Sequence, residues 1–259
     1  MTERSADDVA ADKVETRDER DSRTPAEETT SRRRGRARKQ RGPVVGFLRE
    51  VAIVMVSALV ISLVLKTFFI QPFYIPSISM ETTLDVGDRI VVNKLAPGPF
   101  ELERGDVVVF LDPGGWLEGE PVPQLSPVEQ ALTWIGLLPE NAGQHLVKRV
   151  IGLPGDHVVC CDDTGRLTVN GVAIDETYVI DGASPSDKPF DVVVPEGDLW
   201  VLGDNRPRSA DSRYNTDKVE EGFVPIDNVV GRVFVVIWPL DHATLMHRPD
   251  DVFAEVPDP

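Results

Sequence analysis

The chain has 259 residues, of which 41% are hydrophobic, and a formal net charge of −16. This length allows one substantial domain, and the acidic character makes nucleic acid an unexpected partner. The two cysteines, Cys160 and Cys161, are adjacent, whereas a zinc site needs more ligands at wider spacing, so no metal or cofactor is expected. The pair is either two strand-end thiols or a vicinal disulfide formed in an oxidising compartment.

Residues 1–43 are dominated by Asp, Glu, Arg, Ser and Thr. A segment with so few apolar residues cannot bury enough surface to offset the entropy lost on ordering, so we expect a disordered tail. Its last part, from Ser31 to Arg41, carries seven positive charges directly before an apolar run. Taken alone, this cluster fits a solvated charge run, a nucleic-acid arm or a nuclear-localisation-like signal.

The apolar segment 44–70 is expected to be a transmembrane signal anchor. Lys66 is the only charge between Val51 and Ile70, and these 20 residues give about 30 Å of helix, enough to span a bilayer core. Lys66 lies near the far end, where its ammonium can reach the interface. A buried core helix is the alternative, but such helices seldom run this long without a polar stripe. By the positive-inside rule the basic tail stays cytoplasmic, and the chain is a single-pass protein of the cell membrane.

Short β-rich runs separated by turn residues follow the anchor. We therefore expect residues 71–259 to form an extracytoplasmic, mainly β domain of antiparallel sheets. The predicted strands are Arg89–Asn93, Asp106–Phe110, Leu146–Ile151, Asp156–Cys160, Leu199–Leu202 and Val229–Trp238. A hairpin is predicted over Arg166–Ile174, because Asn170-Gly171 between apolar flanks is a strong hairpin signal.

The stretch 112–145 interrupts this pattern with a loop rich in Pro and Gly. Within it, Ser126 as N-cap, Pro127 at the first helical position and Glu129 in a capping box predict a short amphipathic helix. Its apolar face is expected to pack on the sheet, with contact to the membrane surface as the alternative.

Three polar clusters within the β-rich part could carry chemistry. Ser77 and Ser79 are two residues apart and point to the same side if the segment is extended. Lys148 and Arg149 lie inside an apolar strand on opposite faces, and a buried lysine has a pKa lowered toward neutral, which makes it a possible general base. The third cluster is the polar loop 203–213. Read singly, the three fit a polar linker, an edge strand with two exposed bases, and a polar turn.

Together and in this order, the clusters resemble the bacterial type I signal peptidases, or leader peptidases, a family that uses a Ser–Lys dyad. The resemblance covers most of residues 70–239 and rests on five ordered stretches. These are Pro76–Met80, Gly87–Lys94, Arg104–Phe110, Lys148–Asp156 and Gly203–Arg213. One departure is Thr82, because the family usually has Pro two residues after the Met of the first stretch.

The resemblance implies a membrane-bound serine endopeptidase that removes N-terminal signal peptides from exported preproteins. Cleavage after small, Ala-x-Ala-like residues by acyl-enzyme chemistry is the implied reaction. The implied partners are preprotein signal peptides and the lipid bilayer, with the secretion translocon as a further candidate. The implied fold is a β-rich catalytic domain of antiparallel sheets, with its active site close to the membrane surface.

The family's site residues match six positions of this chain. The resemblance implies Ser79 as the nucleophile and Lys148 as the general base. It also implies an oxyanion hole formed by the Ser77 hydroxyl and the Ser79 backbone N–H. Two further roles complete the list: Ser209 orients the lysine amine, and Asp211 with Arg213 forms a structural ion pair.

Two other functions fit parts of the pattern. A self-cleaving Ser–Lys peptidase of the repressor type would carry a helix-turn-helix DNA-binding part and no membrane span. A membrane-anchored, non-catalytic binding protein would have lost a catalytic residue, and none is missing. The short spacing between Lys66 and Ser79 favours a peptidase that works at a membrane. About a dozen residues separate the two, so Ser79 lies within about 40 Å of the interface.

Overall fold

The computed structural model describes residues 43–117, 126–127 and 144–259. The chain divides into two compact units, Met1–Gly46 and Phe47–Pro259, and nearly all of the described residues belong to the second. The expected disordered tail, up to residue 42, lies outside the described residues. So does the expected short amphipathic helix beyond its first two residues.

The first described element is helix α1, Pro43–Phe68. Its segment Val44–Phe68 is long and apolar enough to cross a membrane, by length and composition, and its most apolar stretch is not buried in the rest of the described chain. The helix ends two residues before the expected boundary at Ile70. Strand β1, Ile70–Tyr74, starts there instead, because Ile70 pairs with Asn93 and Pro72 disfavours a continuing helix.

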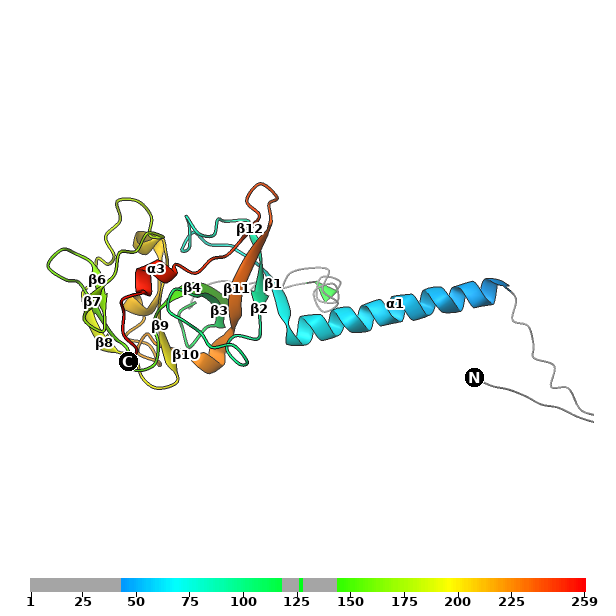
Figure 1. The fold of residues 1–259 in the computed structure, drawn as a ribbon, viewed down its shortest axis with the longest axis horizontal. Coiled ribbons are helices and arrows are strands. Elements are labelled where there is room, and N and C mark those ends of the chain that lie inside the picture. Colours follow the sequence, from blue (N-terminus) through cyan, green and yellow to red (C-terminus); the bar gives the residue numbers. More distant parts are fainter. Residues whose placement is uncertain (1–42, 118–125, 128–143) are drawn as a thin grey trace, which may run out of the picture. The chain divides into compact units, whose positions relative to one another are not determined.

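Eight strands form the larger sheet, and their pairings are antiparallel (Figure 1). Its order is β1-β2-β11-β3-β4-β9-β10, with β12 paired to β11. The strands after β1 are β2 (Arg89–Asn93), β3 (Val107–Leu111), β4 (His145–Gly152), β9 (Asp198–Leu202), β10 (Val224–Pro225), β11 (Val229–Trp238) and β12 (Thr244–Leu245).

Four short strands form a second antiparallel sheet in the order β7-β6-β5-β8. They are β5 (His157–Cys160), β6 (Leu167–Val169), β7 (Val172–Ala173) and β8 (Phe190–Val193). The predicted hairpin is confirmed: β6 and β7 pair around Asn170 and Gly171, whose φ angles of 51° and 80° are both positive, as a type I′ turn requires.

Short helical segments complete the described chain. They are the 3-10 turns η1 (Arg206–Arg208), η2 (Ser212–Tyr214) and η3 (Ile226–Asn228), and the helix α3 (Asp250–Phe253). The prediction of a mainly β fold of antiparallel sheets after an apolar helix is confirmed. Each predicted strand is present in the structure, and its first and last residues differ from the predicted ones by at most one position. The predicted hairpin Arg166–Ile174 contains two strands.

Three groups of buried apolar side chains form the core. The group that supports the site contains Phe73 and Ile75 from the β1 region, Met80 and Leu84 from the segment after it, and residues of β2, β3 and β11. The four named side chains are at most 2% exposed. The polar segment around Ser79 is therefore anchored in the core on both sides of the serine.

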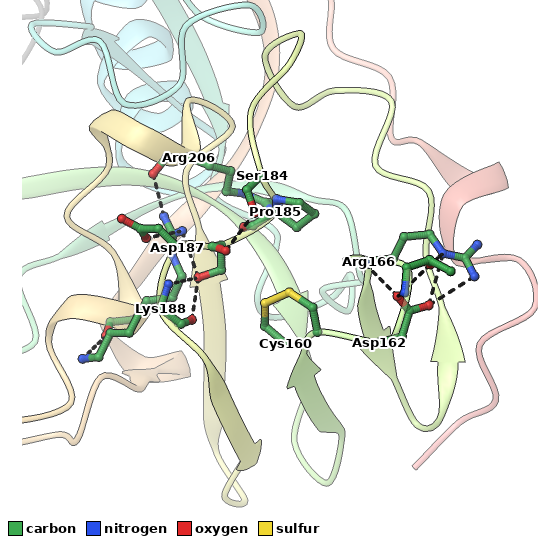
Figure 2. Close-up of a disulfide and its surroundings, with 12 residues drawn as sticks. Cys160, Asp162, Arg166, Ser184, Pro185, Asp187, Lys188 and Arg206 are labelled. Carbon is green, nitrogen blue, oxygen red and sulfur yellow. Dashed lines mark hydrogen bonds and ion pairs between the residues drawn. A yellow bond between two sulfur atoms is a disulfide. The ribbon is translucent and has the colours of Figure 1, made fainter.

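Cys160 and Cys161, at the end of β5, are joined in a vicinal disulfide (Figure 2). Of the two states considered for this pair, two free thiols or a vicinal disulfide, the structure thus contains the disulfide. Next to it, Asp162 accepts hydrogen bonds from the backbone and guanidinium of Arg166 in the turn that leads into β6. The disulfide lies in the four-stranded sheet and contributes no side chain to the site described below.

Candidate active site

Ser79 lies in the segment that follows β1, which ends at Tyr74, and directly precedes the buried Met80. Its side chain is itself largely buried, since Ser79 is 7% exposed. The hydroxyl oxygens of Ser77 and Ser79 are 3.4 Å apart, which makes them neighbours on one side of the segment, as the spacing predicted. The serine is therefore fixed at the edge of the core, with a second hydroxyl beside it.

Lys148 comes from β4, 69 positions later in the sequence. This strand is hydrogen-bonded on both sides, to β3 and to β9, and these pairings fix its backbone in the sheet. The amine Nζ donates a hydrogen bond to Ser79 Oγ at 2.7 Å and another to the carbonyl of Val147 at 2.9 Å. The structure thus places the amine and the hydroxyl of the predicted pair in direct contact.

Burial lowers the pKa of Lys148 from 10.5 to about 8. The loss of hydration, which disfavours the ammonium form, is the largest cause. The negative charges of Asp211 and Asp204 oppose this effect, and Arg213 adds to it. Among the described residues no carboxylate forms an ion pair with the amine. A substantial fraction of the lysine is therefore neutral slightly above physiological pH, and only the neutral amine can accept a proton.

Arg149 is the next residue, and it is as buried as Lys148: both are 3% exposed. Alternation sends its side chain to the other face of β4, where it forms a two-bonded ion pair with Asp204, at 2.9 and 2.6 Å. Sequence reasoning expected one of the two bases to face the core. The structure buries both, because Asp204 neutralises the arginine while the lysine has a hydroxyl and a carbonyl as partners.

The loop 203–213 is held together by Asp211 and Arg213. Arg213 donates from Nε and Nη2 to the two oxygens of Asp211, both at 2.8 Å, and neither side chain is exposed. Asp211 also accepts from the backbone N–H of Gly203, and Arg213 donates to the carbonyl of Arg206. The pair therefore ties the end of the loop to its start at Gly203 and to Arg206.

Ser209 lies in this loop close to the serine segment. A Cβ atom on Gly203 would lie 2.2 Å from Ser209 Oγ and 2.5 Å from the Ser79 carbonyl oxygen, so Gly203 is the contact between the two serine-containing segments. Ser209 is 4% exposed, and within the described parts of the chain its hydroxyl has no hydrogen-bond partner. Its role in orienting the lysine stays a prediction.

Asn205 is a site residue that sequence reasoning did not single out. Its backbone N–H donates to the Ser79 carbonyl at 3.1 Å, and its side-chain amide donates to the Ile78 carbonyl and to Glu81, both at 3.0 Å. The Gly203-Asp204-Asn205 sequence indicates a tight polar turn at a strand end. That signal does not reveal a partner 127 positions earlier in the chain.

Residues 48–238 match the family model described as signal peptidase, peptidase S26. Signal peptidase I of Mycobacterium tuberculosis (strain ATCC 25618 / H37Rv) is 41% identical over 216 residues, which cover 74% of this chain and 73% of that protein. A probable signal peptidase I of Mycobacterium leprae (strain TN) is 40% identical over 224 residues, which cover 74% and 76%.

A solved structure is also similar to this chain. It is a signal peptidase I from Enterococcus faecalis V583, with 31% identity and a TM-score of 0.33, and the match covers 51% of this chain and 97% of that one. The family model spans well over half of the chain, and the relatives align along most of their length. The chain therefore belongs to the signal peptidase family, peptidase S26.

Proposed function

We propose that the chain is a signal peptidase I that works with Ser79 as its nucleophile and Lys148 as its general base. The observation that carries this proposal is the 2.7 Å contact between Lys148 Nζ and Ser79 Oγ at a buried position. A serine hydroxyl is a weak nucleophile until an adjacent base takes its proton. A lysine whose pKa is lowered to about 8 supplies that base without a histidine.

The reaction proceeds through an acyl-enzyme. Ser79 Oγ transfers its proton to the neutral Nζ of Lys148 and attacks the scissile carbonyl carbon. The resulting ammonium then protonates the leaving amine, the C–N bond breaks and an ester to Ser79 remains. Lys148, neutral again, takes a proton from water while the water oxygen attacks the ester carbonyl carbon. The bond from this carbon to Ser79 Oγ then breaks, the ammonium of Lys148 returns its proton to Ser79 Oγ, and the signal peptide leaves with a free carboxyl group.

The negative oxygen of each tetrahedral intermediate needs donors close to Ser79. We assign this role to the Ser77 hydroxyl and the Ser79 backbone N–H. The 3.4 Å between the two serine oxygens supports the assignment of Ser77. Losing one such donor typically costs about 10²–10³ in rate. Asp211 and Arg213 support the site by fixing the loop that contains Ser209.

The proposed substrates are exported preproteins, cut after small, Ala-x-Ala-like residues. We assign residues 44–70 as a single transmembrane anchor, the tail 1–43 as cytoplasmic and residues 71–259 as the extracytoplasmic catalytic domain. Helix α1 supports this assignment by its length and apolar composition. Ser79 is only a short length of chain beyond the helix, which is where a preprotein's cleavage site leaves the bilayer. The lipid bilayer and the secretion translocon are the proposed partners there.

The test is cleavage of a preprotein by the purified full-length chain in detergent, with the cut position read by mass spectrometry. We expect one cut after a small residue, and no cut by the Ser79→Ala variant. Substitution of a similarly small exposed serine, Ser57→Ala on α1, is the matched control and should leave cleavage intact. Cleavage by Ser79→Ala at the wild-type rate would contradict the nucleophile assignment, and no cleavage by the wild type would contradict the activity.

A further inference from the structure

Asn205 anchors the backbone on both sides of the Ser79 Cα. Its side-chain amide donates a hydrogen bond to the Ile78 carbonyl at 3.0 Å, and its backbone N–H donates to the Ser79 carbonyl at 3.1 Å. The N–H and the Cα of Ser79 lie between these two carbonyl groups in the chain. One residue therefore holds both peptide groups that flank the Ser79 Cα, and these groups set the direction of the Ser79 N–H and side chain.

The first of these peptide groups supplies an oxyanion donor in the proposed mechanism. A peptide unit is planar, and in its trans form the carbonyl and the N–H point in opposite directions. The Ile78 carbonyl and the Ser79 N–H belong to one such unit, which is trans. Holding the Ile78 carbonyl toward Asn205 therefore aims the Ser79 N–H away from Asn205. Within the described chain this N–H donates no hydrogen bond, so it is available to a substrate oxygen.

Hydrogen bonds to the Ile78 carbonyl also make the Ser79 N–H a stronger donor. This carbonyl accepts a second hydrogen bond, from the Glu81 N–H at 3.2 Å. Hydrogen bonds that are connected through one peptide group polarise each other, and the effect is larger away from water. Asn205 is 2% exposed, so its bond to the Ile78 carbonyl lies in such a place.

Asn205 is itself held in place. It follows the buried Asp204, whose carboxylate pairs with Arg149 of β4, and its own carbonyl accepts from the Arg208 N–H at 3.0 Å. Its side-chain amide also donates to the Glu81 carboxylate at 3.0 Å. Both partners of the amide are thus acceptors, which only the NH₂ group of an asparagine side chain can satisfy. A carboxylate at this position would face a carbonyl and a second carboxylate.

We propose that Asn205 is a positioning residue that aligns and polarises the peptide group between Ile78 and Ser79, so that the Ser79 N–H points at the oxyanion of the tetrahedral intermediate. This inference rests on the proposed oxyanion hole. It gives Asn205 a part in binding the transition state that is separate from proton transfer by Lys148.

Three substitutions test the side-chain bond, because the backbone bond from residue 205 to the Ser79 carbonyl survives in each of them. Asn205→Ala removes the amide. Asn205→Asp keeps its size and places an acceptor opposite two acceptors. Glu81→Ala removes the other partner of the amide and leaves the bond to the Ile78 carbonyl intact.

Asn170→Asp is the matched control. The Asn170 amide likewise donates to a carboxylate and a carbonyl, those of Asp156 and Pro257, at 2.8 and 2.9 Å. It lies in the turn between β6 and β7, in the second sheet. Asn170→Asp therefore creates the same repulsion as Asn205→Asp without touching the segment around Ser79. We expect it to lower the thermal midpoint and to leave kcat unchanged.

The experiment measures kcat and KM for preprotein cleavage at pH 8.5 by the full-length variants in detergent, with their thermal midpoints. It also measures the inhibition constant Ki of a peptide aldehyde that ends in Ala-x-Ala. Ser79 Oγ adds to the aldehyde carbon, the Oγ proton passes to Lys148 Nζ, and the carbonyl electron pair moves to the oxygen. That oxygen then occupies the oxyanion hole, so Ki reports on the hole as a transition-state analogue does.

We expect kcat to fall about tenfold for Asn205→Ala and about 10²-fold for Asn205→Asp, since a misplacement of about 1 Å can cost 10²-fold. Ki should rise by the same factors, while KM stays close to the wild-type value. Ser77→Ala removes the other proposed oxyanion donor and should show the same pattern, with a loss of about 10²–10³. Glu81→Ala should stay close to the wild type in kcat and Ki. A merely structural defect would lower the folded fraction, which reduces kcat and does not raise Ki.

Wild-type kcat and Ki for Asn205→Asp would overturn the inference, and so would a loss of kcat without a rise in Ki. Equal losses for Glu81→Ala and Asn205→Ala would also overturn it, since the amide would then act through Glu81. If Asn205→Asp does not fold, Asn205→Ala decides the question. Ser79→Ala, run in parallel, tests the proposed function separately. An active Ser79→Ala contradicts the nucleophile itself, whereas an inactive Ser79→Ala with fully active Asn205 variants contradicts the role of Asn205 alone.

Discussion

At the scale of single residues, the environment of Lys148 determines whether its amine can act as the proposed base. The same strand buries a lysine and an arginine side by side, and of the two only the arginine has a carboxylate partner, Asp204, within the part of the chain that the structure describes. The lysine has a hydroxyl and a carbonyl as hydrogen-bond partners instead. Burial, with no ion-pair partner among the described residues, lowers the pKa of the amine and suits Lys148 to the proposed role of base.

We therefore expect kcat/KM for preprotein cleavage to rise with pH and to level off above about pH 8, where Lys148 loses its proton. Below that pH the protonated amine cannot accept the proton of Ser79, so each unit of pH should cost about tenfold in rate. Initial rates between pH 6 and pH 10 measure this, with circular dichroism at each pH to show that the protein stays folded. A profile without slope over this range would contradict a lysine base.

The identity of these residues could be inferred from the sequence, but not their contacts. Ser79 and Lys148 were recognised because ordered motifs surround them, and periodicity left open which base of β4 was buried. Thr82 stood out only as a departure from a motif, since nothing local reveals its positive φ or its bond to Tyr178. Asn205 was missed for the same reason: its partners at 78, 79 and 81 come from another part of the chain.

At the scale of elements, two segments that lie outside the strands, 77–84 and 203–213, carry most of the candidate site. Each is fixed to a strand of the larger sheet by buried contacts: Met80 and Leu84 pack into the core, and the Ser212 hydroxyl accepts from the backbone of Val201 in β9. The Asp211–Arg213 pair is the strongest link within the second segment, because both side chains are fully buried.

Replacing Asp211 with asparagine should destabilise the protein by about 3–5 kcal/mol, because Arg213 would be left as a buried charge without its partner. The exposed pair of Arg166 with Asp175 offers a matched control, and Asp175→Asn should leave the stability nearly unchanged, because solvent screens this pair. Denaturant titration of the three proteins in detergent measures the difference. Equal stability of Asp211→Asn and the wild type would show that the pair does not hold this loop.

Strands with strong patterns were predicted well and short ones were not. The runs of Val and Ile in β3, β4 and β11 and the Asn-Gly turn of the β6–β7 hairpin are local signals, and the structure has these elements. Strand β12 has two residues and exists because Val235 and Val236 of β11 pair with it. Strand β1 continues the apolar run of α1, so composition could not reveal the change from helix to strand.

At the scale of the whole molecule, sheet topology explains how distant motifs meet. Strand β4 lies between β3 and β9, and this order brings Lys148 close to the loop that follows β9. The C-terminal segment adds a further connection, because Phe253 and Val256 pack with the apolar side chains of the second sheet and of Trp200 in β9. The carbonyl of Pro257 also accepts hydrogen bonds from Arg104 and Asn170. Residues far apart in sequence therefore share one framework with the site.

The proposed mechanism depends most on Lys148 as the base, and Lys148→Met tests this role most directly. Methionine fits the volume of the buried lysine but has no amine. Since the folded-state pKa of about 8 lies below the usual 10.5, the unfolded wild type binds more protons between these values. Wild-type stability is therefore complete above about pH 10.5 and falls as pH drops to about 8. Lys148→Met has no amine to titrate and so does not lose stability in this way as the pH falls. At pH 7 it should therefore be at least as stable as the wild type.

The measurement is single-turnover cleavage of a preprotein by Lys148→Met at pH 8.5, with its thermal midpoint determined in the same buffer. We predict a folded protein whose cleavage rate is lower by about 10⁴-fold or more, the loss expected when a member of a catalytic unit is removed. Cleavage by this folded variant at a rate close to that of the wild type would contradict the Ser79–Lys148 dyad.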